Sequence, residues 1–103
     1  MQYNLILAEE AGVREWLATL AAEAWPGTQP LAVGSVEQAR TRAAGSSFHL
    51  AIVADGPAGC TLAVSELAER LPHAWIVIVA RDDAEARLVG GLRAGAHGYL
   101  LRE

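Results

Sequence analysis

Two short runs of the sequence contain no polar residue, and they constrain the fold more than any other feature. They are LAIVA at residues 50–54 and IVIVA at residues 76–80. A strand with one face in water alternates between apolar and polar residues, whereas a strand covered on both faces is apolar throughout. Both runs therefore predict central strands of a parallel sheet that carries helices on its two faces.

The remaining β-like runs complete a regular alternation of strands and helices. The predicted strands cover residues 3–8, 31–33, 50–54, 75–80 and 98–101. Right-handed crossovers between such strands give an open parallel sheet of α/β class. In such a sheet, ligands bind beyond the carboxyl ends of the strands, where the strand order reverses.

Two helices are predicted in the first half of the chain. The first has an apolar stripe at i, i+3, i+4 and i+7, formed by Val13, Trp16, Leu17 and Leu20. It ends at the sequence WPG of residues 25–27, because proline and glycine both interrupt helices. The second helix runs from an N-cap at Ser35 to about Gly45.

Two more helices are predicted in the second half. The third is marked by Leu62, Leu67 and Leu71 and ends near Pro72. Asp82 or Asp83 caps the fourth, which ends at Gly95. We expect Leu88, Val89 and Leu92 to form its inward face.

The 103 residues are expected to form one domain, and the sequence ends at the fifth strand. The sixth element that would close such a fold, a final helix, is missing from this chain. One face of the sheet would then be apolar and in contact with water. We expect a truncated chain, a partner helix or an unusual dimer to account for it.

Composition excludes several classes of function. The net charge is −4, with eight arginines and no lysine, so direct binding of nucleic acid by this domain is not expected. Without lysine there is no Schiff-base chemistry and no Walker-type phosphate loop. A single cysteine, no secretory pattern and no apolar run long enough for a membrane predict a cytoplasmic protein.

Three stretches of the sequence resemble one known family. They are LILAEEAGVREWL, FHLAIVADGPAG and IVIVARDDAEARLVGGLRAGAHGYLLRE, which together cover nearly the whole chain. They resemble the CheY-like receiver domain of bacterial response regulators, particularly the receivers of helix-turn-helix transcriptional regulators. The resemblance implies a CheY-like (flavodoxin-like) five-stranded sheet.

The resemblance also implies a phosphorylation site. In the family, two acidic residues hold Mg²⁺, an aspartate accepts the phosphoryl group, and a lysine, a hydroxyl and an aromatic residue respond to it. The acidic pair falls on Glu9 and Glu10, which are longer than aspartate. The hydroxyl position falls on Ala80, the aromatic on Tyr99 and the lysine on Arg102.

The phosphoacceptor position falls on Ala54, with Asp55 one residue later as the alternative. Because side chains alternate along a strand, an offset of one residue would turn the Asp55 carboxylate away from the site. A bulge at the strand end would allow Asp55 to reach it. Arg102 is either a surface residue or an internal cation that replaces the metal beside Glu9, Glu10 or Asp55.

The leading interpretation is a pseudo-receiver that is not an enzyme, needs no cofactor and acts by protein–protein contact. We expect it to bind a protein partner or form a homodimer through residues 83–101, in particular Leu88, Val89, Leu92 and Tyr99. A DNA-binding output domain in a longer chain would connect it to transcription. The alternative is a working phosphoacceptor at Asp55 with Mg²⁺ held by Glu9 and Glu10. A third interpretation is an anion sensor using Arg81 and Arg102.

Overall fold

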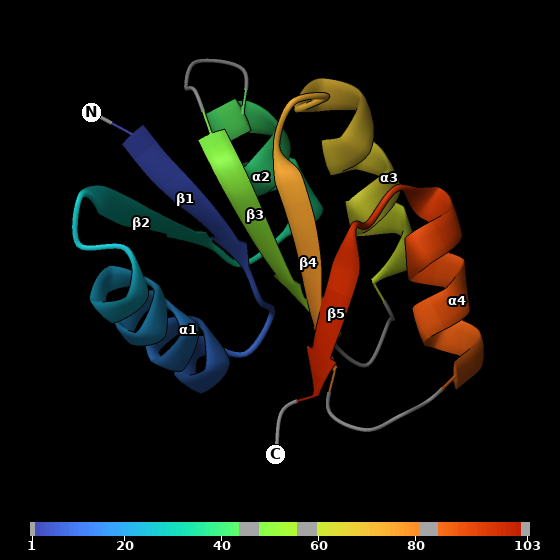
Figure 1. Ribbon diagram of the computed structural model, residues 1–103, viewed down its shortest axis with the longest axis horizontal. Coiled ribbons are helices and arrows are strands. Elements are labelled where there is room, and N and C mark those ends of the chain that lie inside the picture. The colour runs from blue at the N-terminus through green and yellow to red at the C-terminus, as the bar shows by residue number, and fades with distance from the viewer. Residues whose placement is uncertain (1, 44–47, 56–59, 81–84, 102–103) are drawn as a thin grey trace.

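The computed structural model describes residues 2–43, 48–55, 60–80 and 85–101, with the side chains of 2, 43 and 85–88 left out. Strands and helices alternate along the chain as predicted (Figure 1). The strands are β1 (Gln2–Leu7), β2 (Thr28–Val33), β3 (Phe48–Ala54), β4 (Trp75–Ala80) and β5 (Gly98–Leu101). The helices are α1 (Ala11–Ala24), α2 (Val36–Ala43), α3 (Thr61–Arg70) and α4 (Glu85–Ala94).

All neighbouring strands are parallel, and their order in the sheet is β2-β1-β3-β4-β5. This is the flavodoxin-like order, so the predicted CheY-like α/β fold is confirmed. The strand order reverses between β1 and β3, and the carboxyl ends of these two strands form the expected place for a site.

Strand β2 is longer than predicted, because it begins at Thr28 rather than at Leu31. Pro30 lies inside it and cannot donate a backbone hydrogen bond. The strand tolerates this residue because β2 is at the edge of the sheet and pairs only with β1.

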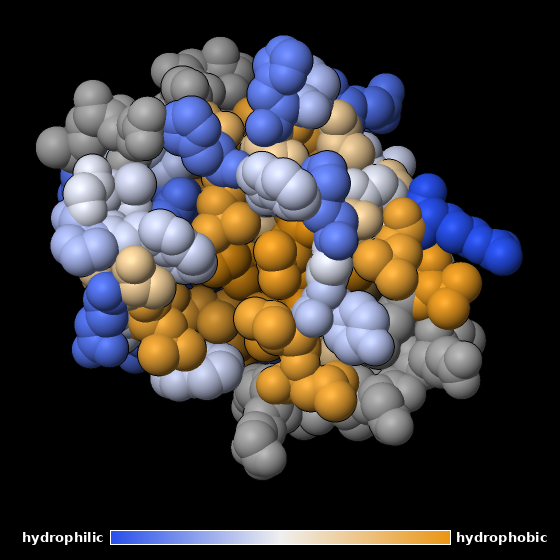
Figure 2. Space-filling view, viewed as in Figure 1, coloured by the Kyte–Doolittle hydropathy of each residue, from blue (hydrophilic) through white to orange (hydrophobic). Residues whose placement is uncertain are grey.

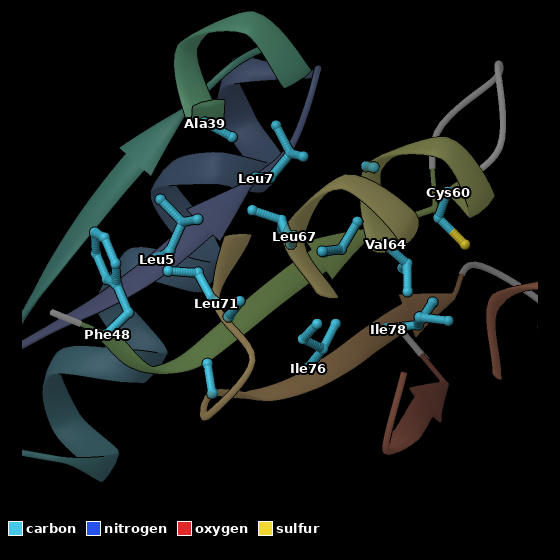
Figure 3. Packing of buried hydrophobic residues seen from close by; sticks show 14 of the residues in the cluster. Leu5, Leu7, Ala39, Phe48, Cys60, Val64, Leu67, Leu71, Ile76 and Ile78 are labelled. Atoms are coloured by element: carbon cyan, nitrogen blue, oxygen red, sulfur yellow. The ribbon is translucent and has the colours of Figure 1, made fainter. Parts of the chain in front are cut away.

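Apolar side chains fill both faces of the sheet, but unequally. Helices α2, α3 and α4 cover one face, where the larger cluster of buried side chains lies (Figure 3). Leu5, Ile76 and Ile78 of the strands pack there with Val64 and Leu67 of α3. Helix α1 lies on the opposite face over β1 and β2, where Val13, Leu17 and Ala21 meet Ile6 and Ile52.

The predicted apolar stripe of α1 is only half correct. Val13 and Leu17 are buried with Ala21, whereas Trp16 and Leu20 are each 43% exposed. Both exposed side chains are on a flank of α1 that no described helix covers. The spacing identified the helix correctly, but Ala21 rather than Trp16 or Leu20 completes its buried face.

The prediction that Val89 and Leu92 form the inward face of α4 is wrong, and the same prediction for Leu88 falls outside the described side chains. Among the α4 positions whose burial is described, residues 89–94, Gly91 is the buried one, and an added Cβ there would overlap the Ile78 side chain. Val89 and Leu92 are 39% and 38% exposed, and the Leu88 side chain lies outside the described residues. Because glycine has no side chain, α4 approaches the sheet through Gly91, and Val89 and Leu92 are turned outward.

Part of the sheet beside α1 is covered by none of the described helices. Figure 2 shows apolar side chains gathered over this region. They form an open groove of about 310 Å³, lined by Leu17, Leu20, Ala21, Ala24, Trp25, Leu50, Ile52, Val77, Val79 and Leu100. Among the described helices, none is long and apolar enough to cross a membrane.

Candidate functional site

The carboxyl edge of the sheet contains a pocket of about 230 Å³ beside the point where the strand order reverses. The ends of β1 and β3, the loop after β2 and the start of α3 form its walls. Its lining consists of Leu7, Ala8, Glu9, Gly34, Ser35, Val36, Val53, Ala54, Leu62 and Ala63. The described lining is mainly apolar, and Glu9 is the one acidic residue among these described positions.

The predicted acidic pair lies at this edge but does not converge with Asp55. Glu9 and Glu10 are both exposed, and Glu10 is the N-cap residue of α1 without a side-chain capping bond. Among the described residues, no three side chains of the metal-binding types form a group that could hold an ion. Glu9, Glu10 and Asp55 all belong to that described part, so the structure does not assemble them into a magnesium site.

Ala54 and Asp55 differ in orientation, as expected for neighbouring residues at a strand end. Ala54 is the last residue of β3, lines the edge pocket and packs with the cluster on the α1 side. Asp55 follows the strand and is only 4% exposed. Its backbone N–H donates to the Val79 carbonyl over 2.9 Å, which continues the pairing of β3 with β4. Ala54, rather than Asp55, is therefore the strand-end side chain that reaches the pocket.

The positions expected to respond to a phosphoryl group lie on the neighbouring strands. Ala80 ends β4, is buried and stands opposite Leu101. Tyr99 of β5 stands opposite Ile78 of β4 and is 46% exposed. Arg102, like Arg81, lies outside the described residues, so its predicted role as an internal cation is not described by the structure.

Arg14 places a positive charge at this edge that the sequence reasoning missed. Its Nη1 atom donates to the carbonyl oxygens of Ala8 over 2.8 Å and of Glu9 over 3.0 Å. The guanidinium also fills the space beside Gly34, where an added Cβ would lie 2.7 Å from Nη1. Arg14 lies in the first turn of α1, within reach of the segment between β1 and the helix, but which carbonyls it contacts depends on its side-chain conformation.

The strongest charge pairing in the described residues lies away from the edge pocket, between α2 and α3. Glu66 contacts Arg40 at 3.1 Å and Arg70 at 3.4 Å. The hydrogen bond from Arg40 lowers the pKa of the Glu66 carboxyl, with Arg70 acting in the same direction and desolvation opposing them. This cluster joins two helices and contributes no side chain to the pocket.

The fold and this edge define a class of domain, the CheY-like open α/β sheet with its candidate site at the carboxyl ends of β1 and β3. No protein-family model matches the sequence, and no curated protein matches it. The similarity of this chain to known proteins is therefore a similarity of structure.

Three solved structures illustrate the similarity. A response regulator from Burkholderia pseudomallei, crystallised with a phosphorylated aspartic acid, calcium and citrate, has a TM-score of 0.86 at 18% identity. The match covers 99% of this chain but 60% of that one. Chemotaxis protein CheY4 of Vibrio cholerae has a TM-score of 0.84 at 15% identity, covering 99% and 87% of the two chains. A pilus assembly-related protein of Burkholderia pseudomallei has a TM-score of 0.77 at 24% identity, covering 98% and 78%.

These identities are low, so the likeness establishes the fold and not the activity. The chain spans about three fifths of the first of these relatives. The relatives also differ among themselves, since their descriptions name a response regulator, a chemotaxis protein and pilus assembly.

Proposed function

We propose that the chain is a pseudo-receiver: a signalling domain of the two-component type that acts through protein contacts and not through phosphorylation of an aspartate. The observation that carries this proposal is the pair of alanines at the strand ends. Ala54 ends β3 and Ala80 ends β4. A methyl group can neither attack a phosphoryl group nor bind its oxygens.

The surroundings of these two alanines support the same proposal. Mg²⁺ requires several oxygen ligands in near-octahedral geometry. The exposed Glu9 and Glu10 do not converge with Asp55, so the residues present do not fit the metal site of a receiver. In the part of the chain that the structure describes, a cation at this edge is the Arg14 guanidinium, which donates to two backbone carbonyls.

The contact surface that we propose is the α4–β5 surface, defined as Val89, Leu92, Tyr99 and Leu101. All four side chains are apolar or aromatic, and each is between 38% and 54% exposed. Leu88 belongs to the same predicted surface, but its side chain lies outside the described residues. Exposed apolar residues concentrated on neighbouring elements favour a protein partner or a second copy of the domain. In a longer chain, such contacts would regulate an output domain such as a DNA-binding module.

Intact mass spectrometry tests the central claim. The protein is incubated with acetyl phosphate and Mg²⁺ beside an Asp55→Asn variant and a phosphorylatable receiver as the positive control. We expect the control to gain one phosphoryl group and both forms of this chain to remain unmodified.

A phosphoryl adduct on the wild type that is absent from Asp55→Asn would contradict the proposal. It would establish the alternative, a divergent phosphoacceptor at Asp55. An adduct on both the wild type and Asp55→Asn would mean that another residue is phosphorylated. That result would also contradict the proposal that the domain works without phosphorylation.

A further inference from the structure

The two edge strands of the sheet differ in how well they resist further pairing. Within the described chain, β2 pairs with β1 alone and β5 with β4 alone (Figure 1). An edge strand presents backbone N–H and C=O groups to other strands, and proteins commonly block such an edge with proline, charge or a bulge. Strand β2 contains Pro30. Strand β5 reads GYLL, with neither proline nor charge, and its register with β4 is regular.

Pro30 stands on the outward side of β2. Successive residues of a strand direct their backbone groups to opposite sides, toward one neighbouring strand and then toward the other. The Ala8 N–H donates to the Val33 carbonyl oxygen over 3.1 Å, so the backbone groups of Val33 point toward β1. Three residues earlier, Pro30 lies where an N–H would point away from the sheet. Because proline lacks that donor, the β2 edge is closed to a further strand.

Backbone hydrogen bonds also show which residues of β4 face β5. The Asp55 N–H donates to the Val79 carbonyl oxygen over 2.9 Å, so the backbone groups of Val79 point toward β3. Those of its neighbour Ile78 therefore point toward β5. The Ile76 carbonyl oxygen agrees with this alternation, because it accepts the N–H of His97, directly before β5, over 2.8 Å. The even-numbered residues of β4 thus face β5.

The outward groups of β5 follow from its register with β4. In a parallel pair, a residue that bonds the neighbouring strand lies between two residues that bond back. Leu100 stands opposite Val79, between the residues of β4 that face β5, so the backbone groups of Leu100 point toward β4. The backbone groups of Tyr99 and Leu101 consequently point away from the sheet.

We infer that β5 pairs antiparallel with β5 of a second copy of this chain, about a two-fold axis at Leu100. Tyr99 of each copy then stands opposite Leu101 of the other. Each copy offers two N–H and two C=O groups at these positions, so the pairing forms four hydrogen bonds. The two sheets become one continuous sheet.

The same register gives every exposed apolar side chain of β5 a partner. Leu100, which is 62% exposed, meets Leu100 of the second copy at a position without hydrogen bonds, where the Cα atoms lie about 4.5 Å apart. Because Leu100 lines the groove beside α1, the two grooves become continuous. On the other face, Tyr99 packs against Leu101 of the second copy. A second copy fits this edge because one register satisfies both the backbone and the side chains.

Helix α4 leaves room for this approach. It packs on β4 through Gly91, next to the Ile78 side chain. In the joined sheet the two β4 strands are three strand spacings apart, which is about 14 Å. A helix with its side chains is about 10–12 Å across, so the two α4 helices fit on the same face without overlap.

The inference rests on the proposed function in one respect, since Tyr99 and Leu101 belong to the α4–β5 surface and the second copy would be the partner of that surface. The two claims are measured separately, association by molar mass and phosphorylation by intact mass. A monomer that is never phosphorylated would overturn the dimer alone, and a phosphorylated dimer would overturn the proposed function alone.

Sedimentation equilibrium tests the association. Four hydrogen bonds and a few side chains form a small interface, so we expect a dissociation constant of about 100 µM. The molar mass should be mainly that of a monomer at about 10 µM protein and mainly that of a dimer at about 1 mM. A monomer mass at about 1 mM would overturn the inference.

Cysteine cross-linking tests the register. Leu100→Cys places two thiols across the axis with their Cα atoms about 4.5 Å apart, within the range that a disulfide spans. Leu101→Cys is the matched control, because the two copies of residue 101 are diagonal neighbours about 7–8 Å apart. The native Cys60 is buried, so the wild type is the blank. With oxidised glutathione, Leu100→Cys should form the covalent dimer at least about tenfold faster than Leu101→Cys, and equal rates would overturn the register.

A proline tests the backbone pairing. Leu101→Pro removes an outward N–H that β4 does not use, so it should raise the dissociation constant at least about tenfold while circular dichroism shows the fold retained. Leu101→Val keeps the N–H and should change the constant less than about threefold. Unchanged association of Leu101→Pro would overturn the inference. Should Leu101→Pro not fold, the comparison of Leu100→Cys with Leu101→Cys decides.

Discussion

At the scale of single residues, Gly91 sets the distance between α4 and the sheet. A Cβ at this position would overlap the Ile78 side chain and lie 3.5 Å from the Cys60 sulfur. Gly91→Ala should therefore lower the free energy of unfolding by about 1–3 kcal/mol, although alanine is the better helix former. Urea unfolding measures this change.

Gly12 provides the matched control, since it lies in α1 with nothing within 4 Å of an added Cβ. Gly12→Ala should raise the free energy of unfolding by about 0.5–1 kcal/mol, because only backbone entropy changes. Equal effects of the two substitutions would contradict the close packing inferred at Gly91.

Arg14 is the second residue whose role can be isolated. Arg14→Met keeps much of the side-chain length but removes the donors to the Ala8 and Glu9 carbonyls. We expect a loss of about 1–2 kcal/mol in the free energy of unfolding, because charge-assisted hydrogen bonds are lost from a partly exposed site. Arg42→Met on the exposed side of α2 is the control and should change it by less than about 0.5 kcal/mol. A similar loss in both variants would indicate a general effect of charge.

At the scale of elements, the ion pairs of Glu66 connect α2 with α3. Glu66→Gln should lower the melting temperature at pH about 7, where the carboxylate bonds Arg40 and Arg70. The lowered pKa of Glu66 means that this stabilisation is present above the ordinary value of 4.5 and is lost as the pH falls through the lowered one. At sufficiently acid pH the variant and the wild type should therefore melt together. A difference that persists there would assign the effect to packing.

The order of the elements could be predicted from the sequence, but the faces of some helices could not. Residues 50–54 and 76–80 identified the central strands because burial on both faces leaves no polar residue. The outward turn of Leu92 was not predictable, since it depends on the approach of α4 through Gly91. Periodicity shows that a helix has an apolar side, but it does not show which residues of that side the sheet and the other helices cover.

The part of the candidate site that could be predicted is the part fixed by the position of a residue along its strand. Placing Ala54 at the end of β3 follows from counting along an apolar run, and the structure has it there. The reach of Arg14 back to the Ala8 and Glu9 carbonyls, just after β1, depends on side-chain conformation across a turn. It was therefore not visible in a linear pattern.

At the scale of the whole molecule, the two faces of the sheet are covered unequally. Of the described helices, α2, α3 and α4 cover one face, while α1 covers part of the other and leaves the groove that Leu100 helps to line. An apolar face of the sheet in contact with water was expected from the sequence alone. The extent of this apolar face depends on how much of the sheet α1 covers. In the structure α1 contacts β1 and β2.

The groove should bind apolar dyes, and Leu100 allows its contribution to be measured. Leu100 is 62% exposed, so Leu100→Gln should leave the free energy of unfolding nearly unchanged while removing apolar contact area from the groove. We expect Leu100→Gln to bind an anilinonaphthalene dye roughly fivefold more weakly, which corresponds to a loss of about 1 kcal/mol of binding free energy. Fluorescence titration measures this change. Leu101→Gln is the control, because Leu101 is the next residue on the same strand, is 54% exposed and does not line the groove. Equal weakening in both variants would mean that the dye responds to the exposed edge of β5, whereas weakening only at Leu100 would locate it on the uncovered face of the sheet.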